Sequence, residues 1–291
     1  MRAKEIMAEQ FAKAQMPCTD TVDTLKAGSA EREVKKLATC FIATPEVIRA
    51  AAGWGADLLI THEPTYYDHR DYDGNIPNNP VMQAKKALLD GTGMTVYRLH
   101  DHMHAGRPDG IIAGELKKLQ WDCDYDNEFA VHLHQKKTAR EIAAELERKW
   151  GLARVRMAGD LDTPMDGVYL MIGAFGEENH MKQLQKDDCQ VLVVGETSDG
   201  ASANTSATRS SSASTRRCWS AAMSAASAAA WRCWRRKSPS STPTSSAVTS
   251  RWARFTATSG EIEVQTICKQ PSLPGRLFFV GNGSARTAAL R

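Results

Sequence analysis

The chain has 291 residues, of which 42% are hydrophobic and 24% charged, with a formal net charge of +3. This is ordinary globular composition without a run of about 18 apolar residues, so we expect no membrane-spanning helix and no membrane partner. The seven cysteines include no C-x-x-C pair, and the polar N-terminus lacks the apolar core of a secretory signal. We therefore expect reduced thiols and a cytoplasmic protein.

The first 127 residues predict an α/β domain. Thr44 and Pro45 are typical of a helix start, with threonine as N-cap and proline at the first helical position. The short apolar segments between the helices are typical of buried strands. Helices are predicted over residues 1–16, 45–53, 80–89 and 110–119, and strands over 37–42, 56–60 and 94–99. This alternation predicts a mostly parallel sheet covered by helices.

A second, smaller α+β unit is predicted over residues 128–198, including a last strand at 190–194. Thr138 and Glu141 have the spacing of a capping box, and the helix that they start carries an apolar stripe. The stripe consists of Ile142, Leu146 and Trp150. Three histidines here are expected to face solvent, two on a strand and one on a polar helix: His132, His134 and His180.

Five side chains that can bind metals follow two of the predicted strands. His62 and Glu63 follow the second strand, and His100, His102 and His104 follow the third. Ligands of α/β sheets bind at the carboxyl ends of strands, and imidazole with carboxylate is the ligand set of zinc, iron or manganese. If the segment is extended, the three alternate histidines share one face. Solvated loop histidines are the alternative, but five such residues at adjacent strand ends favour a metal site.

The segments Asp20–Leu25, Thr44–Ile48 and Gly55–Pro64 resemble the Nif-three-like dinuclear metal centre family, also called GTP cyclohydrolase I type 2 homologues. The resemblance covers residues 1–198 and implies that the second unit is an insertion. It further implies two divalent metal ions per intact chain and a ring-shaped homo-oligomer, commonly a hexamer.

The resemblance also implies the ligands. The family's T-H-H-P block matches a segment in which His62 is followed by Glu63, and its H-T-N-L-D block matches residues 100–104, which places His104 where the family has a metal-binding aspartate. His100 and His102 are further candidates, as ligands or as groups that orient them. Glu196 matches a strand end that faces the site, so we expect it to bind a metal or to orient a ligand.

Residues 199–291 do not continue this pattern. The segment 201–259 holds nine Lys or Arg, no Asp or Glu, and four of the seven tryptophans. A disordered linker is the usual interpretation, and the arginines could bind nucleic acid. We favour a frameshift near residues 199–201, because a shifted frame can turn Met223 into His and Ser227 into Glu. These changes restore the family's C-terminal G-H-x-x-x-E ligands, so we expect no nucleic-acid partner.

The sequence therefore predicts a dinuclear-metal-binding protein, and our first hypothesis is a metal-dependent hydrolase of the GTP cyclohydrolase I type 2-like class. The ions would activate water and stabilise developing charge, and a small molecule of unknown identity would be the substrate. The second hypothesis is a non-catalytic, oligomeric metal-binding or regulatory protein. In this chain no histidine follows His180, so we expect weak metal binding and poor solubility.

Overall fold

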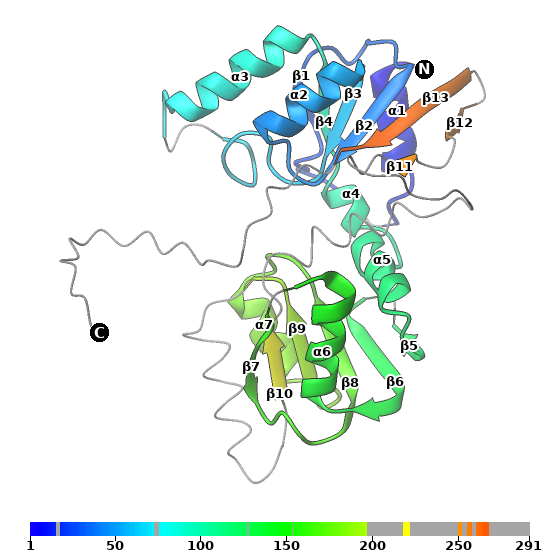
Figure 1. Cartoon of the computed structure of the whole chain (residues 1–291), viewed down its shortest axis with the longest axis vertical. Helices are drawn as coiled ribbons and strands as arrows, with labels where there is room; N and C mark the ends of the chain where they lie inside the picture. The colour runs from blue at the N-terminus through cyan, green and yellow to red at the C-terminus, as the bar shows by residue number, and fades with distance from the viewer. Residues whose placement is uncertain are drawn as a thin grey trace, which may run out of the picture.

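The described part of the chain forms two β-sheets with helices packed on both (Figure 1). In this computed structural model, the described residues are 1–15, 18–72, 76–126, 128–152, 154–196, 218–221, 250–251, 255–257 and 260–267. The predicted mixed α/β class is confirmed. Among these residues, no helix is long and apolar enough to cross a membrane.

The first sheet has a parallel centre, as predicted, and antiparallel strands outside it. Its strands lie in the order β1 (Leu25–Ala27), β4 (Thr95–Arg98), β3 (Leu58–Thr61), β2 (Lys36–Cys40), β13 (Gly260–Thr266) and β11 (Ser250–Arg251), with β12 (Phe255–Ala257) also paired to β13. The four central strands are parallel, whereas β1 and β11 are antiparallel to their neighbours. The carboxyl ends of β3 and β4 therefore lie side by side.

Helices cover both faces of this sheet (Figure 1). The helices α2 (Pro45–Trp54) and α3 (Pro80–Thr92) pack on one face, and α1 (Ala3–Phe11) packs on the other. Consecutive strand residues alternate between these two cores, as expected for side chains of a pleated strand. The predicted start of α2 is confirmed, since the Thr44 hydroxyl accepts a hydrogen bond from the Val47 N–H at 3.3 Å.

The second sheet is mixed and lies in the chain between β4 and β13 of the first. Its order is β5 (Cys123–Tyr125), β6 (Ala130–Lys137), β8 (Met165–Met171), β9 (Val191–Val194), β10 (Cys218–Ala221) and β7 (Arg156–Gly159). The short strands β1 and β5 are not among the predicted elements. Because β5 pairs with β6, this sheet begins at Cys123.

The helices α5 (Gly110–Leu119) and α6 (Ala139–Trp150) pack on one face of the second sheet, and α7 (Glu177–Leu184) packs on the other. The capping box of α6 is confirmed, with the Thr138 N–H donating to the Glu141 carboxylate at 2.8 Å. The predicted stripe of α6 is buried as expected.

The solvent-facing prediction is right for two histidines and wrong for the third. His132 and His134 are exposed on β6, as the alternation predicted. His180 is fully buried, because it lies one turn before Leu184 and the two side chains share the face of α7 that packs on the sheet. Because α7 is mostly polar, its sequence did not indicate which face is buried.

The predictions for residues 199–291 concern a segment of which only four short pieces are described. In these pieces β10 pairs in parallel with β9, and β13 pairs in parallel with β2. Residues 199–201, Met223 and Ser227, on which the frameshift prediction depends, lie outside the described residues. The irregular tail and the frameshift therefore stay hypotheses.

Candidate metal centre

The segment after β4 is a single helical turn, α4 (Asp101–His104), so the prediction of an extended segment is wrong. The carboxylate of Asp23 causes the turn, because it accepts hydrogen bonds from the backbone N–H groups of His100, Asp101 and His102. A buried carboxylate that caps several N–H groups stabilises the start of a helix. In a helix, residues four apart share a face, so His100 and His104 lie together.

His62, His100 and His104 converge on one point at the carboxyl ends of β3 and β4. One ring nitrogen of each can be chosen so that all three lie within 4.8 Å of one another. The ring centroids are 4.7 Å apart for His62 and His100, 4.8 Å for His100 and His104, and 5.3 Å for His62 and His104. His62 is buried, whereas the other two rings are partly exposed. Three imidazoles at this spacing can bind a single metal ion.

In each of these histidines Nδ1 faces an oxygen that can only accept a hydrogen bond. His62 Nδ1 lies 3.0 Å from the carbonyl oxygen of Leu99, which has no proton to donate. His100 Nδ1 lies 2.8 Å from Asp101 Oδ1, and in the same way His104 faces a carboxylate oxygen at 2.8 Å. Nδ1 therefore carries the proton, and Nε2 carries the lone pair that a metal requires.

The carboxylate beside His104 belongs to Asp109, which also starts the next helix. Its Oδ1 accepts hydrogen bonds from Ile111 N and Ile112 N at 2.8 and 3.2 Å, while its Oδ2 faces His104. The helix cap thus fixes the carboxylate that orients the imidazole. Carboxylate–histidine pairs of this kind are common behind metal ligands.

The electrostatic environment keeps two of the rings neutral. Burial, together with the nearby His104, lowers the pKa of His62 far below its ordinary value. Burial and His104 also lower the pKa of His100 to about 4. Burial acts in the same direction on His104, but its hydrogen bond and charge interaction with Asp109 outweigh this and raise its pKa. At neutral pH His62 and His100 therefore present unprotonated Nε2 atoms.

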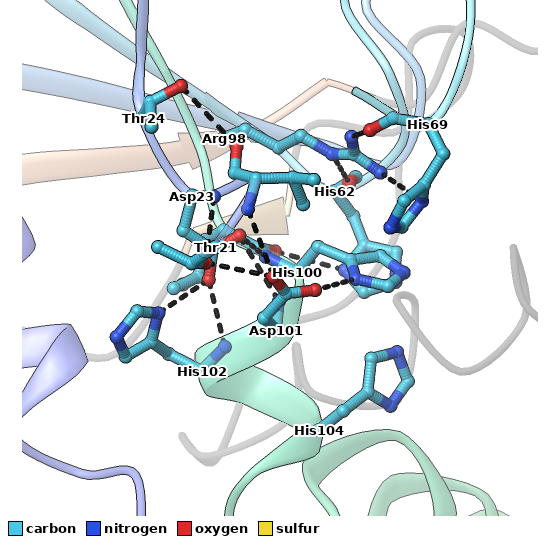
Figure 2. Close-up of polar contacts among 12 residues, drawn as sticks. Thr21, Asp23, Thr24, His62, His69, Arg98, His100, Asp101, His102 and His104 are labelled. Atoms are coloured by element: carbon cyan, nitrogen blue, oxygen red, sulfur yellow. Dashed lines mark hydrogen bonds and ion pairs between the residues drawn. The ribbon is translucent and has the colours of Figure 1, made fainter. Parts of the chain in front are cut away.

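The buried guanidinium of Arg98 holds the loop that carries His62. Its Nε donates to the backbone carbonyl of His62 at 2.9 Å, and another of its nitrogens donates to the carbonyl of His69 (Figure 2). The Arg98 charge also contributes to the low pKa of His62. No spacing pattern indicated this residue, because arginine is rarely fully buried within a strand.

The other predicted site residues lie around this group. His102 points to the opposite side of α4 from His104, where its Nδ1 lies 2.7 Å from Asp23 (Figure 2). Its ring stacks on Phe11. Glu63 is close enough to His104 for their charges to interact. Burial raises the pKa of Glu63, and the charge of Glu196 at the end of β9 raises it further.

The structure also brings His69, which no sequence pattern indicated, together with His100 and Asp101. These three residues form a second group with metal-ligand spacing. However, Asp101 already accepts hydrogen bonds from His100, Thr21 and the Val22 N–H. Burial raises the pKa of Asp101, but these hydrogen bonds outweigh burial and lower the pKa to about 2. We therefore assign Asp101 to orienting His100. No motif pointed to Asp23 or His69, since their partners are distant in the sequence.

The fold and the site together define a two-sheet α/β protein with a candidate histidine metal centre at the carboxyl ends of parallel strands. The residues present fit a divalent ion, because three imidazole rings converge. An oxygen acceptor at Nδ1 orients each ring, so that Nε2 can bind a metal. The chain belongs to the Duf34/NIF3 (NGG1p interacting factor 3) family, whose model matches residues 1–211.

Individual relatives agree with this assignment. The chain is 24% identical over 183 residues to a GTP cyclohydrolase 1 type 2 homolog of Clostridium perfringens, a match that covers 60% of this chain and 68% of that protein. Protein SA1388 of Staphylococcus aureus has a TM-score of 0.64 at 13% identity, over 81% of this chain and 90% of that one. Reduced HcgD of Methanocaldococcus jannaschii has a TM-score of 0.59 at 17% identity, over 81% and 92%. At these identities, the solved structures establish the fold.

Proposed function

We propose that this protein binds a divalent metal ion through Nε2 of His62, His100 and His104. The observation that carries the proposal is the shared orientation of the three rings, each with Nδ1 held by an oxygen acceptor. Solvated loop histidines have no reason to adopt this common arrangement. The nitrogen-rich ligand set favours zinc or iron, with manganese as a weaker fit.

A second ion is proposed beside the first, as in a dinuclear centre. Support comes from Glu63 and Glu196, whose negative charges interact unfavourably near His104. A cation between two such carboxylates would relieve this repulsion. His102 has no part in this proposal, because it faces Asp23 on the other side of α4. The predicted homo-oligomer and cytoplasmic location stay predictions.

We further propose that the metal centre serves a hydrolase of the GTP cyclohydrolase type 2-like class, which the name of the Clostridium relative supports. A bound divalent ion supplies Lewis acidity and activates water. The chain's own carboxylates would orient the ligands, because Asp101 and Asp109 keep the Nδ1 protons of His100 and His104 in place.

The binding step is tested by titrating zinc into the full chain and the His104→Ala variant by isothermal calorimetry. His134→Ala is the matched control, because His134 is also paired with a carboxylate, Asp122, but is exposed on β6. We expect His104→Ala to lose at least 100-fold in zinc affinity and the control to match the parent. Equal affinities for the parent and both variants would refute the site.

The catalytic step is tested separately, with the zinc-, iron- and manganese-loaded chain and a panel of nucleotides, esters and phosphoesters. We expect turnover that chelation of the metal abolishes. A metal-loaded chain that turns over none of these compounds would refute the hydrolase proposal. It would leave metal binding intact and favour the alternative of a non-catalytic metal-binding protein.

A further inference from the structure

A cavity of about 390 Å³ opens beside the metal centre, between the parts of the chain that carry the two sheets. This volume is near the lower end of the roughly 300–1,000 Å³ typical of small-molecule sites. One wall comes from α4 and the loop after it, with Asp101, His104, Arg107 and Asp109. The opposite wall comes from loops of the second sheet, with Phe129 and Phe175. The cavity thus shares His104 with the metal centre.

The second-sheet wall is aromatic. Phe129 and Phe175 meet edge to face, with ring centroids 5.3 Å apart and an interplanar angle of 86°. Both rings are only partly buried, and both line the cavity. An edge-to-face pair presents the face of one ring and the edge of the other, so a planar ring can stack on one phenylalanine and meet the second edge to face.

The other wall is polar and carries both signs of charge, with Asp101 and Asp109 beside Arg107. The carboxylates of Asp101 and Asp109 each face a histidine Nδ1 at 2.8 Å. Beside them, one nitrogen of the Arg107 guanidinium donates to the backbone carbonyls of His104 and Gly106 at 3.2 and 2.9 Å. These contacts hold the Arg107 guanidinium at the cavity wall. A guanidinium has five N–H donors in a plane, an arrangement that fits the oxygens of a carboxylate or phosphate.

We propose that this cavity binds the substrate, and that the substrate is a small organic anion with a flat unsaturated ring. The ring packs against Phe129 and Phe175, the anionic group pairs with Arg107, and the reacting part lies beside His104. Glu128 also lines the cavity, but it is exposed, so water and salt screen its charge. The inference rests on the proposed function of the neighbouring metal centre.

The test uses four probes of similar size in ligand-observed NMR titrations of the full chain, zinc-loaded and chelator-treated. Benzoate and phenyl phosphate are flat anions, cyclohexanecarboxylate is an anion that is not flat, and benzamide is flat but uncharged. We expect the flat anions to bind at least tenfold more tightly than the other two. The chelator-treated arm separates cavity binding from direct binding of an anion to zinc.

Two variants locate the binding. Arg107→Met is expected to weaken benzoate at least tenfold, and Phe175→Leu about threefold to tenfold, in both arms. Arg140→Met and Tyr72→Leu are matched controls, because both residues are exposed and neither lines the cavity. These controls should leave binding unchanged, and thermal melts of all four variants should match the parent within a few degrees.

The outcomes separate the cavity from the metal centre. Benzoate binding that Arg107→Met leaves unchanged, or equal binding of cyclohexanecarboxylate, would overturn the inference. Normal zinc uptake with no binding of any probe would overturn it too, while the metal proposal stands. Probe binding that responds to both variants in a chain that takes up no zinc would support the cavity and refute the metal centre.

Discussion

Replacing Asp23 should disrupt the metal centre without touching a ligand. The Asp23 side chain is fully buried and accepts hydrogen bonds from three backbone N–H groups at the start of α4. Asp23→Ala leaves these donors without an acceptor, and each buried unsatisfied donor costs about 1–3 kcal/mol. Because α4 is partly exposed, water can replace part of this loss, so we expect about 3–5 kcal/mol of destabilisation in total.

Asp23→Asn should cost less, about 1–2 kcal/mol, because its amide oxygen still accepts some of these hydrogen bonds. Both variants should also weaken zinc binding, since α4 positions His100 and His104. A tenfold loss of affinity removes about 1.4 kcal/mol of the stabilisation by saturating zinc.

Urea unfolding with saturating zinc and with chelator measures both effects. The difference in unfolding free energy between the two conditions measures zinc affinity. The unfolding free energy in chelator measures the contribution of the Asp23 hydrogen bonds. The control is Asp122→Ala, which removes an exposed carboxylate paired with His134. An Asp23→Ala variant as stable as the parent in chelator would refute the account of why α4 forms.

Three further predictions concern individual contacts. Asp109→Asn should lower zinc affinity about 10- to 100-fold by calorimetry, because the amide no longer holds the His104 Nδ1 proton as firmly. Burial lowers the pKa of His180, so its contribution to stability is present above its unfolded pKa of about 6.5 and is lost as pH falls below it. Urea midpoints between pH 7.5 and 5 should show this loss, and His180→Gln should reduce it. Lys26→Met breaks a buried ion pair with Asp71 and should cost about 3–5 kcal/mol in thermal unfolding.

Each of these predictions has a control. Asp122→Asn should leave zinc affinity unchanged, and an equal loss in both aspartate variants would argue against a specific role of Asp109. An undiminished pH dependence in His180→Gln would assign it to other groups. The double variant Lys26→Met/Asp71→Asn removes both charges, keeps an acceptor for the Tyr66 N–H and keeps a residue type that tolerates the positive φ of position 71. It should recover most of the stability, and a double variant as unstable as Lys26→Met would show that packing, not charge, is responsible.

Local signals in the sequence predicted the local structure. The helix start at Thr44 and the capping box at Thr138 appear as expected, because both depend on residues within four positions of each other. The buried strands β2, β3 and β4 of the first sheet were predicted by their apolar runs, whereas β13 was not predicted. The short strands β1 and β5 were missed, since three residues are too few to show a period.

The site was predicted less completely, because its geometry depends on contacts across the chain. The sequence placed His62, His100 and His104 together through the meeting of two strand ends. It could not place His102 apart from them, since the capping of α4 by Asp23 joins residues more than 70 positions apart. The burial of Arg98 likewise follows from distant carbonyl partners.

The measurement that tests the metal centre most directly is a zinc titration of the ¹⁵N-labelled chain, followed by long-range ¹H–¹⁵N NMR of the histidine rings. These spectra distinguish protonated, unprotonated and metal-bound ring nitrogens. The account predicts that Nε2 of His62, His100 and His104 shifts to the metal-bound position while their Nδ1 atoms stay protonated. Zinc bound through Nδ1, through other histidines, or not at all would contradict it.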